Sequence, residues 1–409
     1  MKRESCSERD HIDRRKFLKL IAISFAGAAL PWKVVHGTLD ILNHLPRTQV
    51  AITGVKKGSE DRVLIEAVKQ AARAATDFSW LSRGNSVLIK PALNSGNPYP
   101  ATTSPESVRA MVELLKEKGA SKVIVSDMSG IEHVKLTPEK LKGSSRELMN
   151  ESGMVKAAIE AGAELFFPEE EGWNAFFEDE PADSTYWKKG IMMPKILKEV
   201  DHLVLMPRCG RHALLGSSLG MKNAVGYWRT DSRLEYHKYA STIQEKTADA
   251  NTVKSLHDKQ RLVLTAGTKV LTTYGPNKGF VSEPETGLVI ASESIVAHDM
   301  ISLAWLLQNR KTMSEEENKS ARDPYKRQFI VSNTNRFVVL LLGSFGEAWN
   351  AEKLVRNDID SIWDDRVLNR AYEVFGSIPQ VKLVDGEDSV SKDIKKKLMD
   401  MVSVPNQTK

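Results

Sequence analysis

Cysteine is scarce in this sequence of 409 residues, since only Cys6 and Cys209 occur. Iron–sulfur clusters and structural zinc sites need several cysteine ligands close together. The sequence therefore has no iron–sulfur cysteine motif, and its cysteines identify neither a cofactor nor a set of metal ligands. Two isolated cysteines also offer no disulfide framework, so stability has to come from a buried core.

Long hydrophobic runs are lacking as well. The run "LIAISFAGAAL" (Leu20–Leu30) would extend only about 16 Å as a helix, well short of the roughly 30 Å hydrocarbon core of a bilayer. The stretch "NRFVVLLLGSFGEAW" (Asn335–Trp349) is also too short to cross a membrane, and it predicts a buried strand or helix end. We therefore expect no stable transmembrane helix.

Excess positive charge is lacking outside the N-terminal segment. The net charge of the chain is +5, but residues 1–36 contain eight Lys or Arg and four Asp or Glu, which accounts for +4 and leaves +1. A near-neutral body has no broad field to attract a phosphate backbone. Nucleic acid is thus excluded from the expected partners.

The N-terminal segment resembles a bacterial twin-arginine export signal. The matching residues are Arg14, Arg15, Phe17, Leu18 and Lys19, with Asp13 in place of the usual Ser or Thr. The resemblance implies a signal peptide over residues 1–36, the twin-arginine translocase as a transient partner, and a periplasmic or extracytoplasmic location. A basic amphipathic helix is the alternative interpretation.

From Gln49 onward, short β-rich runs alternate with amphipathic helical patterns. The strand "SVLIKP", the helix "SPESVRAMVELLKEKGA" and the strand "KVIVSDMSG" form one βαβ unit, whose crossover makes the two strands parallel. The pattern predicts the α/β class, with a mainly parallel sheet flanked by helices and a helical C-terminal extension. We expect an α/β domain over 47–308, a charged linker or insertion over 309–328, and an extension over 329–409 that packs on the domain.

Loops that follow three predicted strands must emerge at the carboxyl edge of the sheet, where open α/β folds bind ligands. The first two loops supply five candidate residues: Lys90, Asn94, Thr102, Thr103 and Asp127. The Lys90 ammonium is suited to pair with a carboxylate or phosphate, although a surface lysine before a proline turn is the alternative. Asp127 either orients a base or a metal, or caps the next turn.

The third loop, "PRCGRHALLGSSLGMKNAVGYW" (Pro207–Trp228), concentrates basic side chains among glycines. Its candidate residues are Arg208, Arg211, His212, Lys222 and Asn223. Arginine binds carboxylate or phosphate through two parallel hydrogen bonds, so the loop suits an anion. An exposed basic turn is the alternative.

Three blocks of the chain resemble domain-of-unknown-function family 362, over roughly Ser86–Leu307. Lys90 and Pro91 match the start of the family's Lys-Pro-Asn, while Ala92 replaces its Asn. The matches in the two later motifs are Lys222, Asn223 and Gly226, then Val296, Ala297 and Asp299, with Ser294 and Ile295 replacing the usual Asp-Pro. The resemblance implies an α/β fold and adds Asp299 to the candidate residues.

These features predict an exported α/β protein that binds a small anionic ligand or a metal cofactor at the carboxyl edge. In this hypothesis His212 is the catalytic base and Lys90 a second catalytic group, if the site performs acid–base chemistry. Many relatives carry an appended ferredoxin segment, which this chain lacks. The alternative is a non-catalytic accessory or redox-partner protein of an exported enzyme complex.

Overall fold

A computed structural model describes residues 47–404, except for 184, 274, 314–327, 356 and 358. The predicted signal peptide, residues 1–36, and most of the predicted linker lie outside the described residues. From Thr48 onward the chain forms one compact unit.

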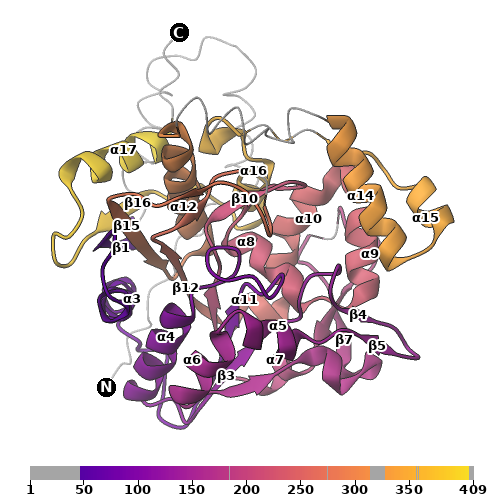
Figure 1. Ribbon diagram of the computed structural model, residues 1–409, viewed down its shortest axis with the longest axis horizontal. Helices are drawn as coiled ribbons and strands as arrows, with labels where there is room; N and C mark the ends of the chain where they lie inside the picture. Colours follow the sequence, from indigo (N-terminus) through magenta and orange to yellow (C-terminus); the bar gives the residue numbers. More distant parts are fainter. Residues whose placement is uncertain are drawn as a thin grey trace, which may run out of the picture. The chain divides into compact units, whose positions relative to one another are not determined.

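An eight-stranded sheet forms the centre of this unit (Figure 1). Its order is β16 (Val381–Val384), β1 (Thr48–Lys56), β15 (Thr286–Ser292), β12 (Gln260–Gly267), β9 (His202–Met206), β2 (Ser86–Pro91), β3 (Lys122–Ser126) and β6 (Glu164–Phe166). Only β15 runs antiparallel to its neighbours, and the other adjacent pairs are parallel. The predicted fold class is therefore confirmed.

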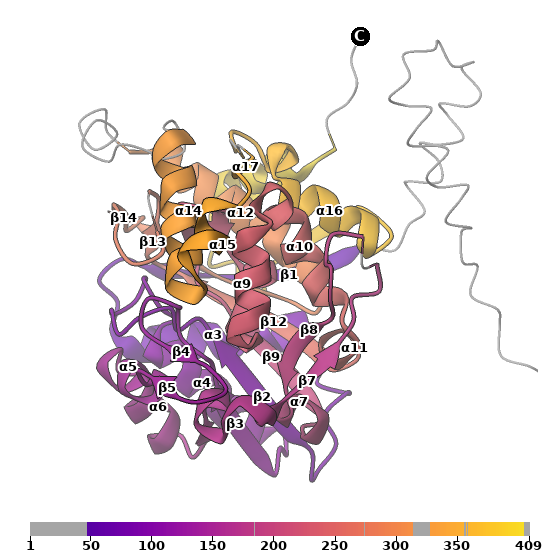
Figure 2. The ribbon, with the colours of Figure 1, turned by 90° about the vertical axis from the view of Figure 1, so that its right-hand side faces the viewer.

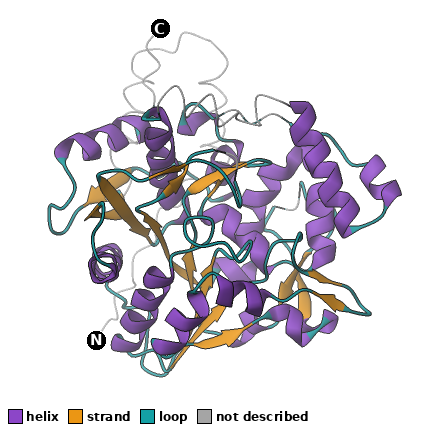
Figure 3. Ribbon diagram, in the orientation of Figure 1, coloured by secondary structure: helices purple, strands orange, loops and turns teal. Residues whose placement is uncertain are grey.

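Both faces of the sheet are buried, which explains why its strands read as nearly continuous apolar runs. Along β2, Val87 and Ile89 join one hydrophobic cluster, whereas Leu88 joins the other. Helices α3 (Asp61–Ala75) and α4 (Pro105–Glu117) cover the first face, and α12 (Ile295–Lys311) covers the second. Figure 3 shows these helices around the strands.

Helix α4 illustrates how local sequence fixes an element next to the site. The Ser104 hydroxyl accepts a hydrogen bond from the Ser107 amide at 3.2 Å, and Pro105 occupies the first helical position. Gly119 follows the helix with a φ of +104°, a left-handed conformation that favours glycine. Ser104 and Pro105 thus begin the helix, and Gly119 permits the turn that follows it.

The connections between these strands contain short hairpins and helices. The strands are β4 (Lys135–Leu136), β5 (Leu141–Lys142), β7 (Phe176–Asp179), β8 (Ile191–Pro194), β10 (Gly210–His212), β11 (Gly216–Ser218), β13 (Val270–Leu271) and β14 (Val281–Ser282). The helices are α5 (Ser145–Glu151), α6 (Met154–Glu160), α7 (Ile196–Glu199), α8 (Gly220–Asn223), α9 (Thr230–Lys238), α10 (Ile243–Asp249) and α11 (Lys254–His257). Strands β11, β10, β13 and β14 form a second, four-stranded sheet.

Among the residues that the structure describes, the C-terminal part contributes four α-helices and one strand of the large sheet. The helices are α14 (Gln328–Leu342), α15 (Phe345–Trp349), α16 (Arg366–Val374) and α17 (Lys392–Val402), and the strand is β16. The stretch Asn335–Trp349 belongs to α14 and α15. Within the described residues, no helix combines the length and apolar character needed to cross a membrane.

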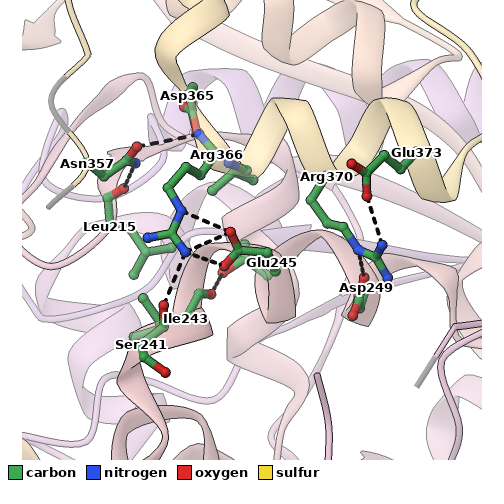
Figure 4. Close-up of polar contacts among 12 residues, drawn as sticks. Leu215, Ser241, Ile243, Glu245, Asp249, Asn357, Asp365, Arg366, Arg370 and Glu373 are labelled. Carbon is green, nitrogen blue, oxygen red and sulfur yellow. Dashed lines mark hydrogen bonds and ion pairs between the residues drawn. The ribbon is translucent and has the colours of Figure 1, made fainter. Parts of the chain in front are cut away.

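Two arginines fasten α16 to α10, as Figure 4 shows. The Arg366 guanidinium donates to both carboxylate oxygens of Glu245, each at 2.9 Å. Arg370 donates to Asp249 at 2.7 Å.

Helix α12 ends at Lys311, so residues 309–311, at the start of the predicted linker, are helical.

Candidate functional site

The three loops of interest follow adjacent parallel strands. Strand β2 lies between β9 and β3, with Lys90 opposite Leu205 and Ile89 opposite Val125. Because all three strands point the same way, their following loops meet at one edge of the sheet. The βαβ pattern in the sequence is sufficient to predict this meeting.

A buried ion pair joins the first two loops. The Lys90 ammonium lies 2.8 Å from Oδ1 of Asp127, and these side chains are only 1% and 3% exposed. Lys90 also donates to the Pro91 carbonyl at 2.8 Å, and Asp127 Oδ2 accepts from the Leu93 amide at 2.7 Å. Burial lowers the pKa of Lys90 and raises that of Asp127, while each group opposes the shift of the other.

The third loop closes over this pair through Asn223 and Gly226. The Asn223 amide donates to the Lys90 carbonyl at 2.8 Å, and its oxygen accepts from the Lys90 ammonium at 3.3 Å. A Cβ on Gly226 would lie 2.0 Å from Asp127 Oδ1 and 2.5 Å from Lys90 Nζ. The Lys-Asn-x-x-Gly spacing therefore has a physical reason, because only glycine permits this close approach.

Arg208, directly after β9, is a buried cation with incomplete hydrogen bonding. Its side chain is 1% exposed, and Nη1 donates to the Pro276 carbonyl at 2.6 Å. Within the described part of the chain, Nε and Nη2 have no hydrogen-bond partner. Burial lowers the pKa of Arg208 to about 10, so the guanidinium keeps its charge at neutral pH. No carboxylate among the described residues neutralises it by an ion pair.

Lys222, in α8, is a second cation of this kind. Its side chain is half-buried and forms no ion pair within the described ranges. Burial lowers the pKa of Lys222 to about 7, and the nearby charges of Arg208, Lys90 and Arg233 add to the shift. Lys222 is thus a group that exchanges its proton near neutral pH.

Arg233, in α9, lies beneath the same loops and was not among the predicted site residues. Its guanidinium donates to the carbonyls of Ser129 at 2.5 Å, Met128 at 2.8 Å and Gly226 at 3.3 Å. Burial lowers its pKa to about 10. Arg233 therefore adds a positive charge whose hydrogen bonds go to backbone oxygens rather than to a carboxylate.

His212 is buried at the end of β10 with a defined tautomer. Its Nδ1 accepts hydrogen bonds from the amides of Leu214 at 3.2 Å and Leu215 at 3.4 Å. A neutral ring whose Nδ1 accepts must carry its proton on Nε2. Burial holds the pKa of His212 well below its usual value, and the charges of Lys222 and Arg208 lower it further. This geometry makes His212 a hydrogen-bond donor, which differs from the general base that the sequence suggested.

His237, in α9, has the opposite tautomer and was missed as a site residue. Its Nδ1 lies 2.9 Å from Oδ1 of Asn335, whose amide nitrogen donates to the His237 carbonyl at 2.9 Å. The amide orientation makes Oδ1 an acceptor, so the His237 proton lies on Nδ1 and Nε2 keeps its lone pair. Burial lowers the pKa of His237 to about 4. Asn335 belongs to α14, so no local sequence signal links the two residues.

Asp299 holds the turn that carries Lys222. Its carboxylate accepts from the amides of Gly220 and Met221, both at 2.8 Å, and from Nδ1 of His298 at 2.8 Å. A Cβ on Gly220 would lie 2.6 Å from Asp299 Oδ1. The carboxylate is occupied by these backbone amides, so Asp299 is a positioning residue for α8.

Four other predicted residues also hold the loops. Thr103 donates to the Met206 carbonyl and accepts from the Ala92 amide, at 2.5 and 2.8 Å. Thr102 donates to the Asn97 carbonyl at 2.9 Å. Asn94 donates to the side-chain oxygen of Asn277, and Arg211 donates to the Gly216 carbonyl at 3.0 Å. These four side chains form hydrogen bonds with other groups of the protein and so stabilise the loops at the carboxyl edge of the sheet.

The C-terminal part supports the His212 hairpin, which local sequence does not reveal. Asn357 donates to the Leu215 carbonyl at 2.7 Å, and the Ser217 hydroxyl donates to Asp365 at 3.5 Å. Figure 4 shows Asn357 and Asp365 beside this segment. Burial raises the pKa of Asp365 to about 6.

Neither a thiol nor a cluster of metal ligands is available at this edge. Cys209 is fully buried, and burial raises its pKa to about 12, so its thiol stays protonated. Among the side chains that the structure describes, no group of three or more His, Cys, Asp or Glu is arranged to hold a metal ion. The polar groups that remain available are mostly cationic.

Comparison with solved structures finds weak similarity. A protein from Thermotoga maritima aligns with a TM-score of 0.37 and 11% identity, over 65% of this chain and 60% of that one. The lactate racemase apoprotein from Thermoanaerobacterium thermosaccharolyticum aligns with a TM-score of 0.38 and 13% identity, over 60% of this chain and 54% of that one. The chain thus spans somewhat more than half the length of each.

Sequence comparison is more informative. No curated protein matches the chain. A family model matches residues 87–304, which include β2 from Val87 onward, the three edge loops and most of α12. Because the match covers more than half of its length, the chain belongs to the family described as domain of unknown function (DUF362).

Proposed function

We propose that this protein binds a small anion, a carboxylate or a phosphate, at the carboxyl edge of its large sheet. The observation that carries the proposal is Arg208, a fully buried guanidinium with two nitrogen atoms that lack partners among the described residues. A buried charge without partners is costly, and an anion would supply both the opposite charge and the missing acceptors. Arginine favours these ligands because its nitrogens match their two oxygens.

The neighbouring cations support the same class of ligand. Lys222 and Arg233 form no ion pair within the described ranges, whereas Lys90 is neutralised by Asp127. The Nε2 proton of His212 adds a neutral donor. This excess of positive charge and donors repels a bare metal cation and attracts an anion.

Acid–base chemistry on the bound anion would use Lys222 and His237. Lys222 has a pKa of about 7, so both of its protonation states are populated near neutral pH. The His237 tautomer leaves a lone pair on Nε2 and anchors the ring through Asn335. In this proposal Lys222 moves the proton, Arg208 holds the anion, and His237 accepts a hydrogen bond.

Calorimetric titration with inorganic phosphate and, separately, with malonate tests the proposal. We expect one of these anions to bind, at constant ionic strength set with sodium chloride. Arg208→Met should weaken binding by at least about 100-fold, as expected for losing a buried charge partner. His212→Ala with Lys222→Ala should abolish it. Arg83→Met is the matched control, because Arg83 is exposed ahead of β2.

Two results would contradict the proposal. One is the absence of binding by either anion to the unaltered protein. The other is binding that survives both the Arg208 and the Lys222 substitutions, because the anion would then lie elsewhere. Circular dichroism of each variant establishes that the fold is retained.

We also propose that residues 1–36 direct export through the twin-arginine pathway. The paired residues Arg14 and Arg15 support this proposal. Replacing both by Lys should leave the protein in the cytoplasm of a host with this pathway, as cell fractionation would show. Unchanged export of the twin-lysine variant would contradict the proposal.

A further inference from the structure

The buried histidines His212 and His237 carry opposite hydrogen-bonding groups at Nε2. His212 carries its proton on Nε2, because the amides of Leu214 and Leu215 donate to its Nδ1. His237 carries its proton on Nδ1, because that nitrogen faces the side-chain oxygen of Asn335. One ring therefore offers a neutral donor at Nε2, and the other offers a neutral acceptor.

Asn335 fixes the His237 ring from α14, which packs against α9, as Figure 2 shows. Its Oδ1 lies 2.9 Å from Nδ1 of His237, and its amide nitrogen donates to the His237 carbonyl at 2.9 Å. Asn335 is fully buried, so water does not compete for these two bonds. Because Nδ1 is held toward α14, Nε2 faces away from that helix. No hydrogen bond or ion pair from a described residue reaches Nε2.

His237 lies within electrostatic reach of His212 and Lys222. Burial is the main cause of the low pKa of both histidines, and the charge of Lys222 lowers both pKa values further. A charge on His237 would in turn lower the pKa of His212. With a pKa of about 4, His237 stays neutral near pH 7 and keeps its lone pair on Nε2. A hydrogen-bond acceptor thus lies among groups that otherwise donate.

We propose that the site takes hydrogen phosphate, an anion that itself donates a hydrogen bond, and that His237 is the residue that selects it. This inference rests on the proposed function and names its ligand class. The phosphate oxygens accept from Arg208, Lys222 and Nε2 of His212, while the P–OH group donates to Nε2 of His237. Asn335 is the positioning residue that keeps this acceptor in place.

The proton on the anion is what distinguishes the ligand classes. Near neutral pH inorganic phosphate keeps at least one proton, whereas sulfate and carboxylates keep none. These unprotonated anions would place an oxygen lone pair against the lone pair of His237 Nε2. A buried acceptor left without a donor weakens binding by about 10- to 100-fold, which is the selectivity we expect.

Calorimetric titrations with inorganic phosphate and with sulfate test the inference. The two anions carry nearly equal charge slightly above neutral pH, so at equal ionic strength the comparison isolates the proton. We expect the unaltered protein to bind phosphate about 10- to 100-fold more tightly than sulfate. In His237→Phe phosphate affinity should fall and sulfate affinity should hardly change, so that the two agree within about threefold. His257→Phe is the matched control, because His257 is exposed on α11, and it should keep the selectivity.

Nitrogen NMR of the protein labelled with ¹⁵N-histidine measures the tautomer without any ligand. The spectrum of His237→Phe identifies the His237 signals by their loss. We expect the proton on Nδ1 in the unaltered protein. Asn335→Leu removes the acceptor that holds this tautomer, so both tautomers should appear and the selectivity for phosphate should decrease.

Four results would overturn the inference and leave the proposed anion site standing. They are equal affinity for phosphate and sulfate, binding of malonate without phosphate, selectivity that survives His237→Phe, and a His237 proton on Nε2. A protein that binds none of the three anions would instead contradict the proposed function itself. Circular dichroism of each variant establishes that its fold is retained, and the first two results need no variant.

Discussion

The two sides of the carboxyl edge contain buried or half-buried cations in opposite electrostatic conditions. After β2 and β3, Lys90 faces Asp127 at 2.8 Å, and Asn223 completes the pair. After β9, Arg208 and Lys222 face no carboxylate at ion-pair distance among the described residues. The first arrangement neutralises its charge inside the protein, whereas the second leaves positive charge that, in the proposed function, an anion would neutralise. Cations at one edge of the sheet thus differ in whether a carboxylate neutralises them.

The largest loss of unfolding free energy is expected from breaking the ion pair between Lys90 and Asp127. Asp127→Asn keeps the size of the side chain but leaves the buried Lys90 charge alone, which costs about 3–5 kcal/mol of unfolding free energy. Urea denaturation would measure the loss. The double variant with Lys90→Met should recover most of it, because no unpaired charge then remains. Equal losses in the single and double variants would show that the pair contributes by packing rather than by charge.

The next largest effect is expected in the pH dependence of the unfolding free energy, which Lys222 causes because no carboxylate among the described residues pairs with it. The pKa of Lys222 is about 7 in the fold but about 10.4 in an unfolded chain. Between these values the unfolded chain binds more protons, so the free energy of unfolding rises with pH in this window. Below pH 7 Lys222 is protonated in both the folded and the unfolded chain, so the full cost of holding its charge in the fold remains. From pH 7 to pH 9 we expect the unaltered protein to gain on the order of 2 kcal/mol relative to Lys222→Met.

Anion affinity should change in the opposite direction over the same range. Binding favours protonated Lys222, so affinity for the anion should fall as pH rises through 7. Calorimetry at pH 6 and pH 8.5 would measure this change, with Lys222→Met as the control that removes it. If the stability difference and the affinity are both flat with pH, Lys222 is not the titrating group.

Replacing Arg208 should change the unfolding free energy less than Asp127→Asn does, and in the opposite direction. Arg208→Met removes a buried charge that has no ion-pair partner, so the empty protein should keep its stability or gain about 1 kcal/mol. Arg233→Met is the contrast, because it leaves the carbonyls of Ser129 and Met128 without donors and should destabilise by about 2 kcal/mol. Urea denaturation of both variants tests this. A loss above about 2 kcal/mol in Arg208→Met would show that the guanidinium is structural.

The sequence is sufficient to predict the sheet edge but not the roles of its residues. Strand and helix periodicity and the βαβ rule place the loops after β2, β3 and β9 together, because these signals are local. Whether a polar group faces a ligand or the backbone depends on distant segments. Asp299, for example, is occupied by the Gly220 amide, which lies 79 residues away along the chain.

The histidines show the same limit. His212 lies in a glycine-rich loop that attracts attention, yet the amides of its own turn occupy Nδ1. His237 lies in the ordinary helix α9, and its tautomer depends on Asn335, which is 98 residues away. Periodicity carries no information about such long-range hydrogen bonds, so a single sequence favours the conspicuous residue over the available one.

The smallest expected effect separates a positioning residue from a ligand-binding one. Thr102 is fully buried, and its hydroxyl donates to the Asn97 carbonyl at 2.9 Å. Thr102→Val keeps the shape but loses this bond, which should cost about 0.5–1.5 kcal/mol of unfolding free energy. Because the hydroxyl is already occupied inside its loop, anion affinity should stay within about twofold of the unaltered value. Arg208→Met should show the reverse pattern, with weak binding and preserved stability. If Thr102→Val instead weakens binding as strongly as Arg208→Met, the loop hydroxyls contact the anion, and the division between the two sides of the edge does not hold.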